Sequence, residues 1–74
     1  MNCRLIAKEY VELYDIFQNS MEVHKGQVIK GTKHKISDKF YTITIEVNGS
    51  PTPYYKEVVE EFFEIHDVNP LEIN

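Results

Sequence analysis

Cysteine is almost missing from this sequence, since Cys3 is the single copy among 74 residues. An internal disulfide and a cysteine-rich zinc site are therefore excluded, which fits a reducing compartment. Long apolar runs are missing too, because a helix that spans a bilayer needs about 20 apolar residues. The amino terminus also lacks the apolar centre of a secretory signal. From these absences we expect a cytoplasmic protein with no membrane partner.

The chain has room for one domain, over residues 1–74. A chain this short buries only about 60% of the surface that it exposes when unfolded, so its margin of stability is thin. Binding to a partner or self-association would add to that margin. Hydrophobic residues make up 42% of the sequence, which is ordinary for a folded protein and argues against disorder.

The net charge of −4 is unevenly distributed along the chain. Residues 21–45 hold five lysines against Glu22 and Asp38, and "VHKGQVIKGTKHK" (residues 23–35) is the most basic stretch. Residues 56–74 hold Lys56 against six carboxylates. Opposite patches of this kind can steer a charged partner, although solvation of both patches explains them without one.

The segment "KFYTITIEV", residues 39–47, predicts a half-buried strand, because apolar and polar side chains alternate and most are β-branched or aromatic. The pair Asn48-Gly49 predicts a tight hairpin turn after it, since both residues tolerate positive φ angles. Pro51 and Pro53 restrict any return strand to a short one or to an edge of the sheet, because proline cannot donate to a ladder.

A second strand is predicted over residues 27–35, which can pair with residues 39–47 across the polar connection between them. Apolar and polar side chains alternate less regularly there than over residues 39–47. Gly31 interrupts the pattern and marks either a bulge or a close approach of two backbones.

Residues 52–67 predict an amphipathic helix near the carboxyl end. Apolar side chains recur there at helical spacing, and charged side chains fill the opposite side. Thr52 is the expected N-cap, with Pro53 at the first helical position. The pair Asn69-Pro70 is the expected stop.

Residues 4–18 are ambiguous between helix and strand. Ile6, Tyr10, Leu13 and Phe17 fit one face of a helix. The same stretch, "RLIAKEYVELY", also has the residue types of a strand that leads into a loop. The residues alone leave both possibilities open.

Three short motifs occur in the order that they have in SH3-like small barrels. Leu13-Tyr14-Asp15 resembles the aliphatic-Tyr-Asp opening of that fold. Residues 25–29, which begin with Lys-Gly, resemble its diverging turn, and Pro53-Tyr54 resembles the Pro–Tyr segment near its end. Short proteins with a similar Lys-Gly turn, a central "Y-x-I" strand and an acidic aromatic tail are common in phages and prophages. The resemblance covers about residues 4–63.

The resemblance implies a β-rich α+β fold, a small SH3-like antiparallel barrel with a C-terminal amphipathic helix. The alternative fold is an N-terminal helix, a β-hairpin and a C-terminal helix. The chain departs from peptide-binding SH3 domains in having no tryptophan, the residue that lines their groove for polyproline ligands. An aromatic groove in this chain would be built from Tyr10, Tyr14 and Tyr54.

The candidate reactive residues do not predict an enzyme. His24, His34 and His66 have no cysteine or second histidine at metal-ligand spacing. Cys3 would need an activating histidine to serve as a nucleophile. We therefore expect no catalytic residue, no cofactor and no metal site.

The leading hypothesis is a non-catalytic module that binds another macromolecule, and the expected partner is a protein. The resemblance implies a phage or prophage accessory protein that binds and modulates a host protein. Its partner would contact the three tyrosines or an acidic helix face, whose charge could imitate that of nucleic acid in a basic cleft. At helical spacing these carboxylates could also hold a divalent cation, but a solvated face explains them without one. The acidic residues are Glu57, Glu60, Glu61 and Glu64.

The alternative hypothesis is a nucleic-acid-binding small barrel that uses the basic hairpin, residues 24–39. Barrels that bind single strands combine a basic groove with stacking aromatics, and Phe40 or Tyr41 would supply one here. A regular strand divides the basic side chains between two faces, and the chain as a whole is acidic, which is unusual for a dedicated nucleic-acid domain. The candidate residues are Lys25, Lys30, Lys33, His34, Lys35 and Lys39.

Overall fold

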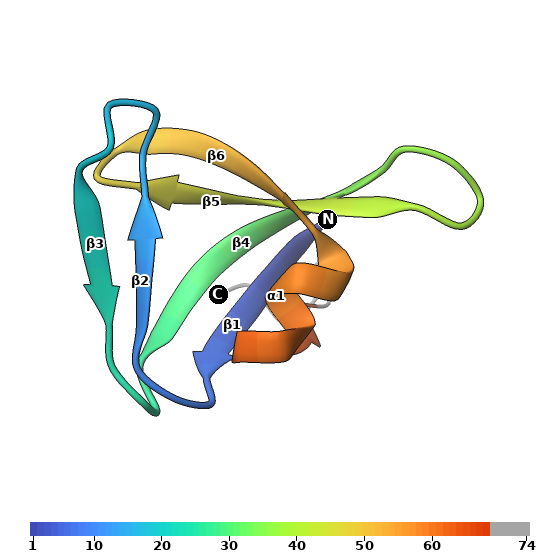
Figure 1. The fold of residues 1–74 in the computed structure, drawn as a ribbon. Helices are drawn as coiled ribbons and strands as arrows, with labels where there is room; N and C mark the ends of the chain where they lie inside the picture. The colour runs from blue at the N-terminus through green and yellow to red at the C-terminus, as the bar shows by residue number, and fades with distance from the viewer. Residues whose placement is uncertain (69–74) are drawn as a thin grey trace.

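The computed structural model describes residues 1–68, which form seven strands and one short helix (Figure 1). Five strands form an antiparallel sheet in the order β6-β5-β4-β1-β7, and β2 and β3 form a separate two-stranded ladder. The elements are β1 (Asn2–Ala7), β2 (Val11–Tyr14), β3 (Ser20–Val23), β4 (Val28–Lys35), β5 (Tyr41–Val47), β6 (Ser50–Tyr55), α1 (Lys56–Phe62) and β7 (Phe63–Asp67). The expected β-rich fold with a helix near the carboxyl end is confirmed.

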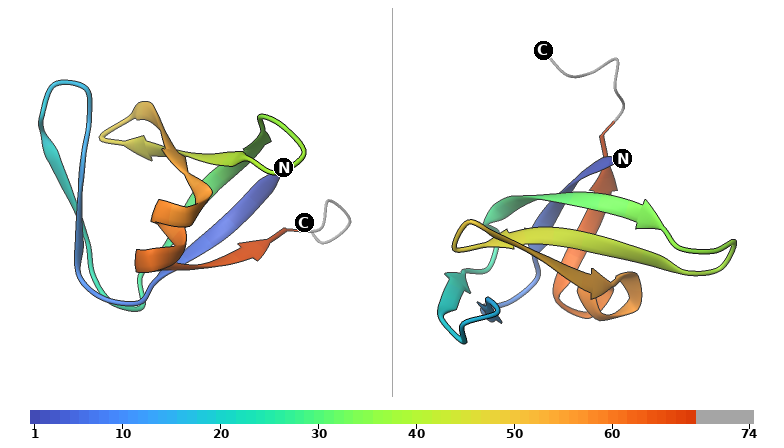
Figure 2. Two further views of the ribbon diagram at one scale, coloured as in Figure 1. Left: turned by 45° about the vertical axis from the view of Figure 1, so that its right-hand side comes forward. Right: turned by 90° about the horizontal axis from the view of Figure 1, so that it is seen from above.

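One apolar core is shared by the five-stranded sheet, the β2–β3 hairpin and α1. Figure 2 shows how these three parts of the fold are arranged. Successive side chains of a strand point to opposite faces, so alternate residues of β1, β2 and β5 enter this core. The helix contributes one buried side chain, Val59. The core consists of Cys3, Leu5, Ala7, Val11, Leu13, Val23, Ile43, Ile45, Val47, Val59 and Phe63.

The predicted strand over residues 39–47 is confirmed from Tyr41 onward as β5, in which Ile43, Ile45 and Val47 are buried. The predicted turn is confirmed as well. Asn48 and Gly49 have φ angles of 52° and 83°, the left-handed values that a two-residue hairpin turn requires.

The return strand β6 lies at an edge of the sheet, as the two prolines predicted. Val47 pairs with Ser50 across the turn, and the pair that closes a two-residue turn is hydrogen-bonded. Bonded pairs then recur at every second residue. Pro51 and Pro53 fall between them, so their nitrogens face away from β5 and their missing N–H groups cost no ladder hydrogen bond.

Gly31 lies at a crowded point of the sheet, paired with Cys3 in β1 and Ile45 in β5. A Cβ atom added there would lie 2.9 Å from Cγ2 of Ile43. It would also lie 3.1 Å from Sγ of Cys3 and from Cδ1 of Leu5. The predicted close approach is therefore confirmed, whereas a bulge is not present, because both ladders keep a continuous register.

The amino-terminal residues form strands, so the alternative fold with an N-terminal helix is wrong. β1 buries Cys3, Leu5 and Ala7 in strand alternation, whereas Tyr10 and Phe17 of the helical stripe are exposed. β1 also pairs with β4 on one side and β7 on the other. These two ladders satisfy the backbone groups that a helix would have satisfied within itself.

The helix predicted over residues 52–67 is wrong at both ends, because α1 covers only seven residues. The hairpin turn returns the chain directly alongside β5, so Thr52 belongs to β6 and is not an N-cap. After Phe62 the chain pairs with the open side of β1 as β7, and this ladder outweighs the helical spacing. The predicted stop at Asn69-Pro70 lies outside the described residues. No helix within residues 1–68 has the length and apolarity needed to cross a bilayer.

We expect Gly31→Ala to lower the free energy of unfolding by about 1–3 kcal/mol, the usual cost of adding a methyl group to a packed core. Urea denaturation followed by circular dichroism measures the loss. Lys30→Ala is the matched control, because this neighbouring side chain is exposed and points to the opposite face, and we expect a change within about 0.5 kcal/mol. Equal effects of the two substitutions would contradict the close approach at Gly31.

Candidate partner-binding groove

An apolar groove lies between the β2–β3 hairpin and α1, with a volume of about 320 Å³. Grooves of this size and lining hold small ligands or single side chains of a partner. We call it the aromatic groove. Its walls include Tyr10, Glu12 and Leu13 from the hairpin side, Tyr54 from β6, and Val58 and Phe62 from α1.

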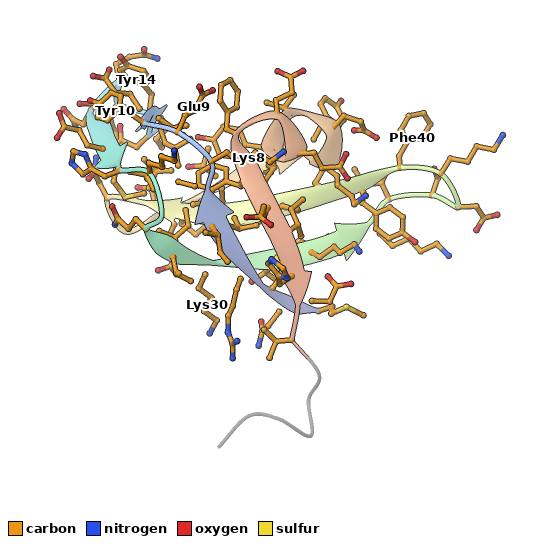
Figure 3. All side chains as sticks on the ribbon, turned by 90° about the horizontal axis from the view of Figure 1, so that it is seen from below. Lys8, Glu9, Tyr10, Tyr14, Lys30 and Phe40 are labelled. Carbon is orange, nitrogen blue, oxygen red and sulfur yellow. The ribbon has the colours of Figure 1, made fainter. Side chains whose placement is uncertain are left out.

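A second hollow of about 550 Å³ adjoins the aromatic groove at Val58, which lines both. Ile36 and Phe40, from the β4–β5 loop, form its other side together with Tyr55. These four side chains are between 44% and 61% exposed. Figure 3 shows Phe40 on the same side of the sheet as Tyr10. Contiguous exposed apolar side chains are typical of binding surfaces.

Of the three tyrosines predicted for a groove, Tyr10 and Tyr54 line the aromatic groove, whereas Tyr14 does not. The Tyr10 and Tyr14 hydroxyls both donate to the carboxylate of Glu12, at 2.9 and 2.7 Å. The Tyr54 hydroxyl lies 3.5 Å from the backbone carbonyl of Tyr14. The hydrogen bond from Tyr14, followed by that from Tyr10, lowers the pKa of Glu12. The same bonds raise the pKa of both phenols, so the carboxylate stays charged and the hydroxyls stay neutral.

Negative charge is concentrated on the hairpin beside the groove. Glu12 and Glu22 are directly opposite in the β2–β3 register, an arrangement that is unfavourable for like charges. The Tyr10 hydroxyl lies 2.9 Å from one carboxylate and 3.0 Å from the other, and its single proton is shared between them. His24 Nε2 lies 3.8 Å from the Glu22 carboxylate.

Asp15 holds the tip of the hairpin in place and is the one buried charged residue within residues 1–68. Its Oδ1 accepts hydrogen bonds from the backbone N–H groups of Phe17 (2.8 Å) and Asn19 (2.9 Å). The side-chain amide of Asn48 donates to the carbonyls of Asn19 and Ser20 and reaches Asp15 Oδ2 at 3.5 Å. The β5–β6 turn is thereby tied to the hairpin that forms one wall of the groove.

The four predicted glutamates do not share one helix face. Glu64 lies in β7 rather than in the helix, so its predicted place on that face is wrong, because the helix ends at Phe62. Glu60 is ion-paired with a lysine one turn earlier, which lowers the pKa of Glu60. Glu57 and Glu61 are exposed and lie next to the groove-lining stripe of α1, since residues three and four apart are neighbours on a helix.

Two of the predicted basic residues are paired within the chain. Lys33 Nζ lies 3.5 Å from the carboxylate of Asp67 and 5.1 Å from the ring centre of Tyr41. Lys35 Nζ lies 3.4 Å from the carboxylate of Asp38. The β4–β5 hairpin therefore offers less free positive charge than its composition indicates.

The other four predicted basic residues lie apart. Lys25 and Lys39 lie outside β4 at its two ends, whereas Lys30 and His34 occupy one face of the strand by alternation. Figure 3 shows Lys30 on the side of the sheet away from α1. Its direct neighbour in β1 is Arg4, a cation that the sequence analysis did not single out.

Cys3 is fully buried in the core, and burial raises the pKa of its thiol, which opposes a role as a nucleophile. Nε2 of His24 lies 3.8 Å from the carboxylate of Glu22, and Nε2 of His66 lies 3.8 Å from the carboxylate of Glu64. Over residues 1–68, no three side chains of histidine, cysteine, aspartate or glutamate are placed to hold a metal ion.

Half of the groove is not predicted by the pattern of residues along the chain. Helical spacing over residues 52–67 predicts Val58 and Phe62 on the apolar side of a long helix, and no pattern marks Ile36 and Tyr55 as part of a surface. The turn at residues 48–49 was the available signal, because it requires a return strand and so shortens the helix.

A scan against protein-family models finds no match, and neither curated proteins nor solved structures match the chain. The interpretation of the groove therefore depends on its own geometry and charge.

We expect the hairpin to lose stability in acid, because Asp15 and Glu12 both have a lowered pKa. Such a carboxylate stabilises the fold above its unfolded-state pKa, and this contribution is lost as the pH falls through the folded-state pKa. For Asp15 the loss sets in below the ordinary value of 3.8. Thermal unfolding measured from neutral to strongly acidic pH tests this.

The matched variant is Asp15→Asn, which lacks the titrating group. Its Tm at neutral pH should be lower than that of the wild type, and its further fall below pH of about 4 should be smaller. Parallel curves for the two proteins would contradict the role assigned to Asp15. Glu46→Gln, an exposed carboxylate on β5, serves as the control and should leave the curve unchanged.

Proposed function

We propose that the protein is a non-catalytic binding module that takes a segment of a partner protein into the aromatic groove. The observation that carries this proposal is the apolar strip formed by the aromatic groove and the second hollow, with exposed carboxylates beside it. The phage or prophage accessory role implied by the resemblance, in which the module modulates a host protein, belongs to the same proposal.

We also propose that the fold is an SH3-like small barrel. The order of the elements supports this, because a long hairpin follows β1, a meander of β4, β5 and β6 follows the hairpin, and a short helix precedes β7. The Lys25-Gly26 pair forms a turn before β4, where the Gly26 N–H donates to the carbonyl of Ala7 at 2.8 Å. In this proposal the five-stranded sheet and the β2–β3 ladder are the two halves of the barrel, and the groove follows their seam.

The charge around the groove indicates the chemistry of the partner. Glu12 and Glu22 lie on the hairpin side, and Glu57 and Glu61 lie on α1. An apolar side chain flanked by lysine or arginine matches this arrangement. Burial of the apolar group would supply most of the affinity, and the carboxylates would supply orientation and a faster encounter.

Nucleic-acid binding has weaker support. A protein that tracks a phosphate backbone needs its cations along one channel. Lys33 and Lys35 have carboxylate neighbours, and Lys30 faces away from the groove. Nucleic acid is therefore an outcome of the test rather than a second proposal.

The test is affinity capture of the tagged full chain from bacterial lysate, with and without nuclease, for the wild type and two matched variants. Val58→Glu places a carboxylate at the centre of the apolar strip, on a side chain that is 44% exposed. Val28→Glu makes the same change at a side chain that is 55% exposed on the opposite face of the sheet. We expect Val58→Glu to reduce binding of a specific partner at least about tenfold, the effect of losing about 1.4 kcal/mol. Val28→Glu should retain it.

The charge contribution is tested with the identified partner. Replacement of Glu57 and Glu61 by lysine should weaken binding, and more strongly at low salt than at high salt. Glu46→Lys on the distant face should not. A partner that still binds Val58→Glu would contradict the groove, and recovery of nucleic acid alone would shift the function to the basic residues.

A further inference from the structure

The two edges of the five-stranded sheet are built differently. At the β6 edge, Pro51 and Pro53 remove two N–H donors from the open side, a device that prevents another strand from pairing. The opposite edge is β7, which borders β1 (Figure 2) and contains no proline. An edge strand without such protection is a template for a further strand.

The register shows which backbone groups of β7 face outward. The Lys8 N–H donates to the Phe62 carbonyl at 2.8 Å, and the Val68 N–H donates to the Asn2 carbonyl at 3.0 Å. Bonded pairs recur at every second residue in an antiparallel ladder, so even-numbered residues of β7 bond to β1. The N–H and C=O groups of Ile65 and Asp67, and the Phe63 carbonyl, therefore point away from β1. Within residues 1–68 these groups have no backbone partner.

The side chains of β7 complement a second copy of the same strand. An antiparallel pair centred on Ile65 places Ile65 opposite its own copy and lets both residues exchange N–H···O bonds. The Asp67 N–H of each strand then meets the Phe63 carbonyl of the other. On the outer face, Glu64 lies opposite His66 of the second copy, and the same pair recurs by symmetry. A histidine hydrogen-bonds a carboxylate when neutral and forms an ion pair with it when protonated.

There is room for an added strand at this edge. A hollow of about 510 Å³ runs along it, lined by Lys8, Glu60 and four residues of β7. The Lys8 side chain is fixed by a 2.7 Å hydrogen bond from its Nζ to the Glu60 carbonyl. Ile65 is half-buried at the margin of the core and would be covered by its own copy.

We propose that two copies of the protein associate through antiparallel pairing of their β7 strands, with a two-fold axis at Ile65. The sheet then continues from one copy into the other. The interface is isologous, so it closes at two copies and leaves no open end. Phe63 lines both the aromatic groove and the hollow along β7, whereas Tyr10, Tyr54 and Val58 of the groove do not line that hollow.

The test is sedimentation velocity of the full chain from micromolar to millimolar concentration. We expect a monomer–dimer equilibrium that two charge variants shift toward the monomer. His66→Glu places glutamates opposite glutamates, and Glu64→Lys combined with His66→Lys places lysines opposite lysines. Each variant alone should raise the dimer dissociation constant about tenfold or more, because two cross-strand pairs become repulsive. An equimolar mixture should associate again, since every cross-strand pair is then attractive.

Amide hydrogen exchange locates the contact. Protection of the Ile65 and Asp67 amides should rise with protein concentration, whereas the Glu64 and His66 amides should be protected at every concentration. Glu46→Lys and Val58→Glu are controls that should dimerise like the wild type. A chain that stays monomeric to millimolar concentration overturns the proposal. So does a dimer that His66→Glu leaves intact, or Ile65 protection that does not depend on concentration.

Discussion

The close packing of β1, β4 and β5 around Gly31 is the constraint on which the rest of the fold depends. A Cβ atom there would lie within 3.1 Å of side-chain atoms of Ile43, Cys3 and Leu5, so these side chains would have to shift. This contact draws the first strand of the chain into the middle of the sheet, with β4 on one side and β7 on the other. A small core gains much from such close packing, since each buried methylene contributes about 0.8 kcal/mol.

The placement of β1 also explains the short helix. The chain must cross from the β6 edge to the open side of β1, at opposite ends of the strand order. The seven residues of α1 make this connection and cover the core with Val59. A longer helix would leave β1 without its second ladder. The crossing leaves Val58 and Tyr55 exposed, and the apolar strip is a consequence of this geometry.

The hairpin that forms the other wall of the groove is held in place by a second set of contacts. Asp15 and Asn48 are 33 residues apart, yet their side chains tie the hairpin tip to the β5–β6 turn. The hairpin is thereby held beside α1, with Glu12 among the residues that line the groove and its carboxylate bonded by two tyrosines. Apolar surface and negative charge are brought to one side of the molecule, while Lys30 lies on the other.

The sequence by itself determined the features that depend on neighbouring residues. Alternation over residues 39–47, the turn at Asn48-Gly49 and the restriction that the prolines place on the return strand all follow from local residue types. At Gly31 the sequence left a bulge and a close approach open, and packing against Cys3, Leu5 and Ile43 decided between them. Only the tertiary structure decided the boundaries of the helix and the strand character of the amino terminus. The spacing of apolar residues at 55–63 and at 6–17 favours a helix. Parts of both stretches form β-ladders instead, with strands that are distant in sequence. The groove was decided in the same way, because Tyr10, Tyr54 and Val58 meet only when the hairpin, the edge strand and the helix pack on one core.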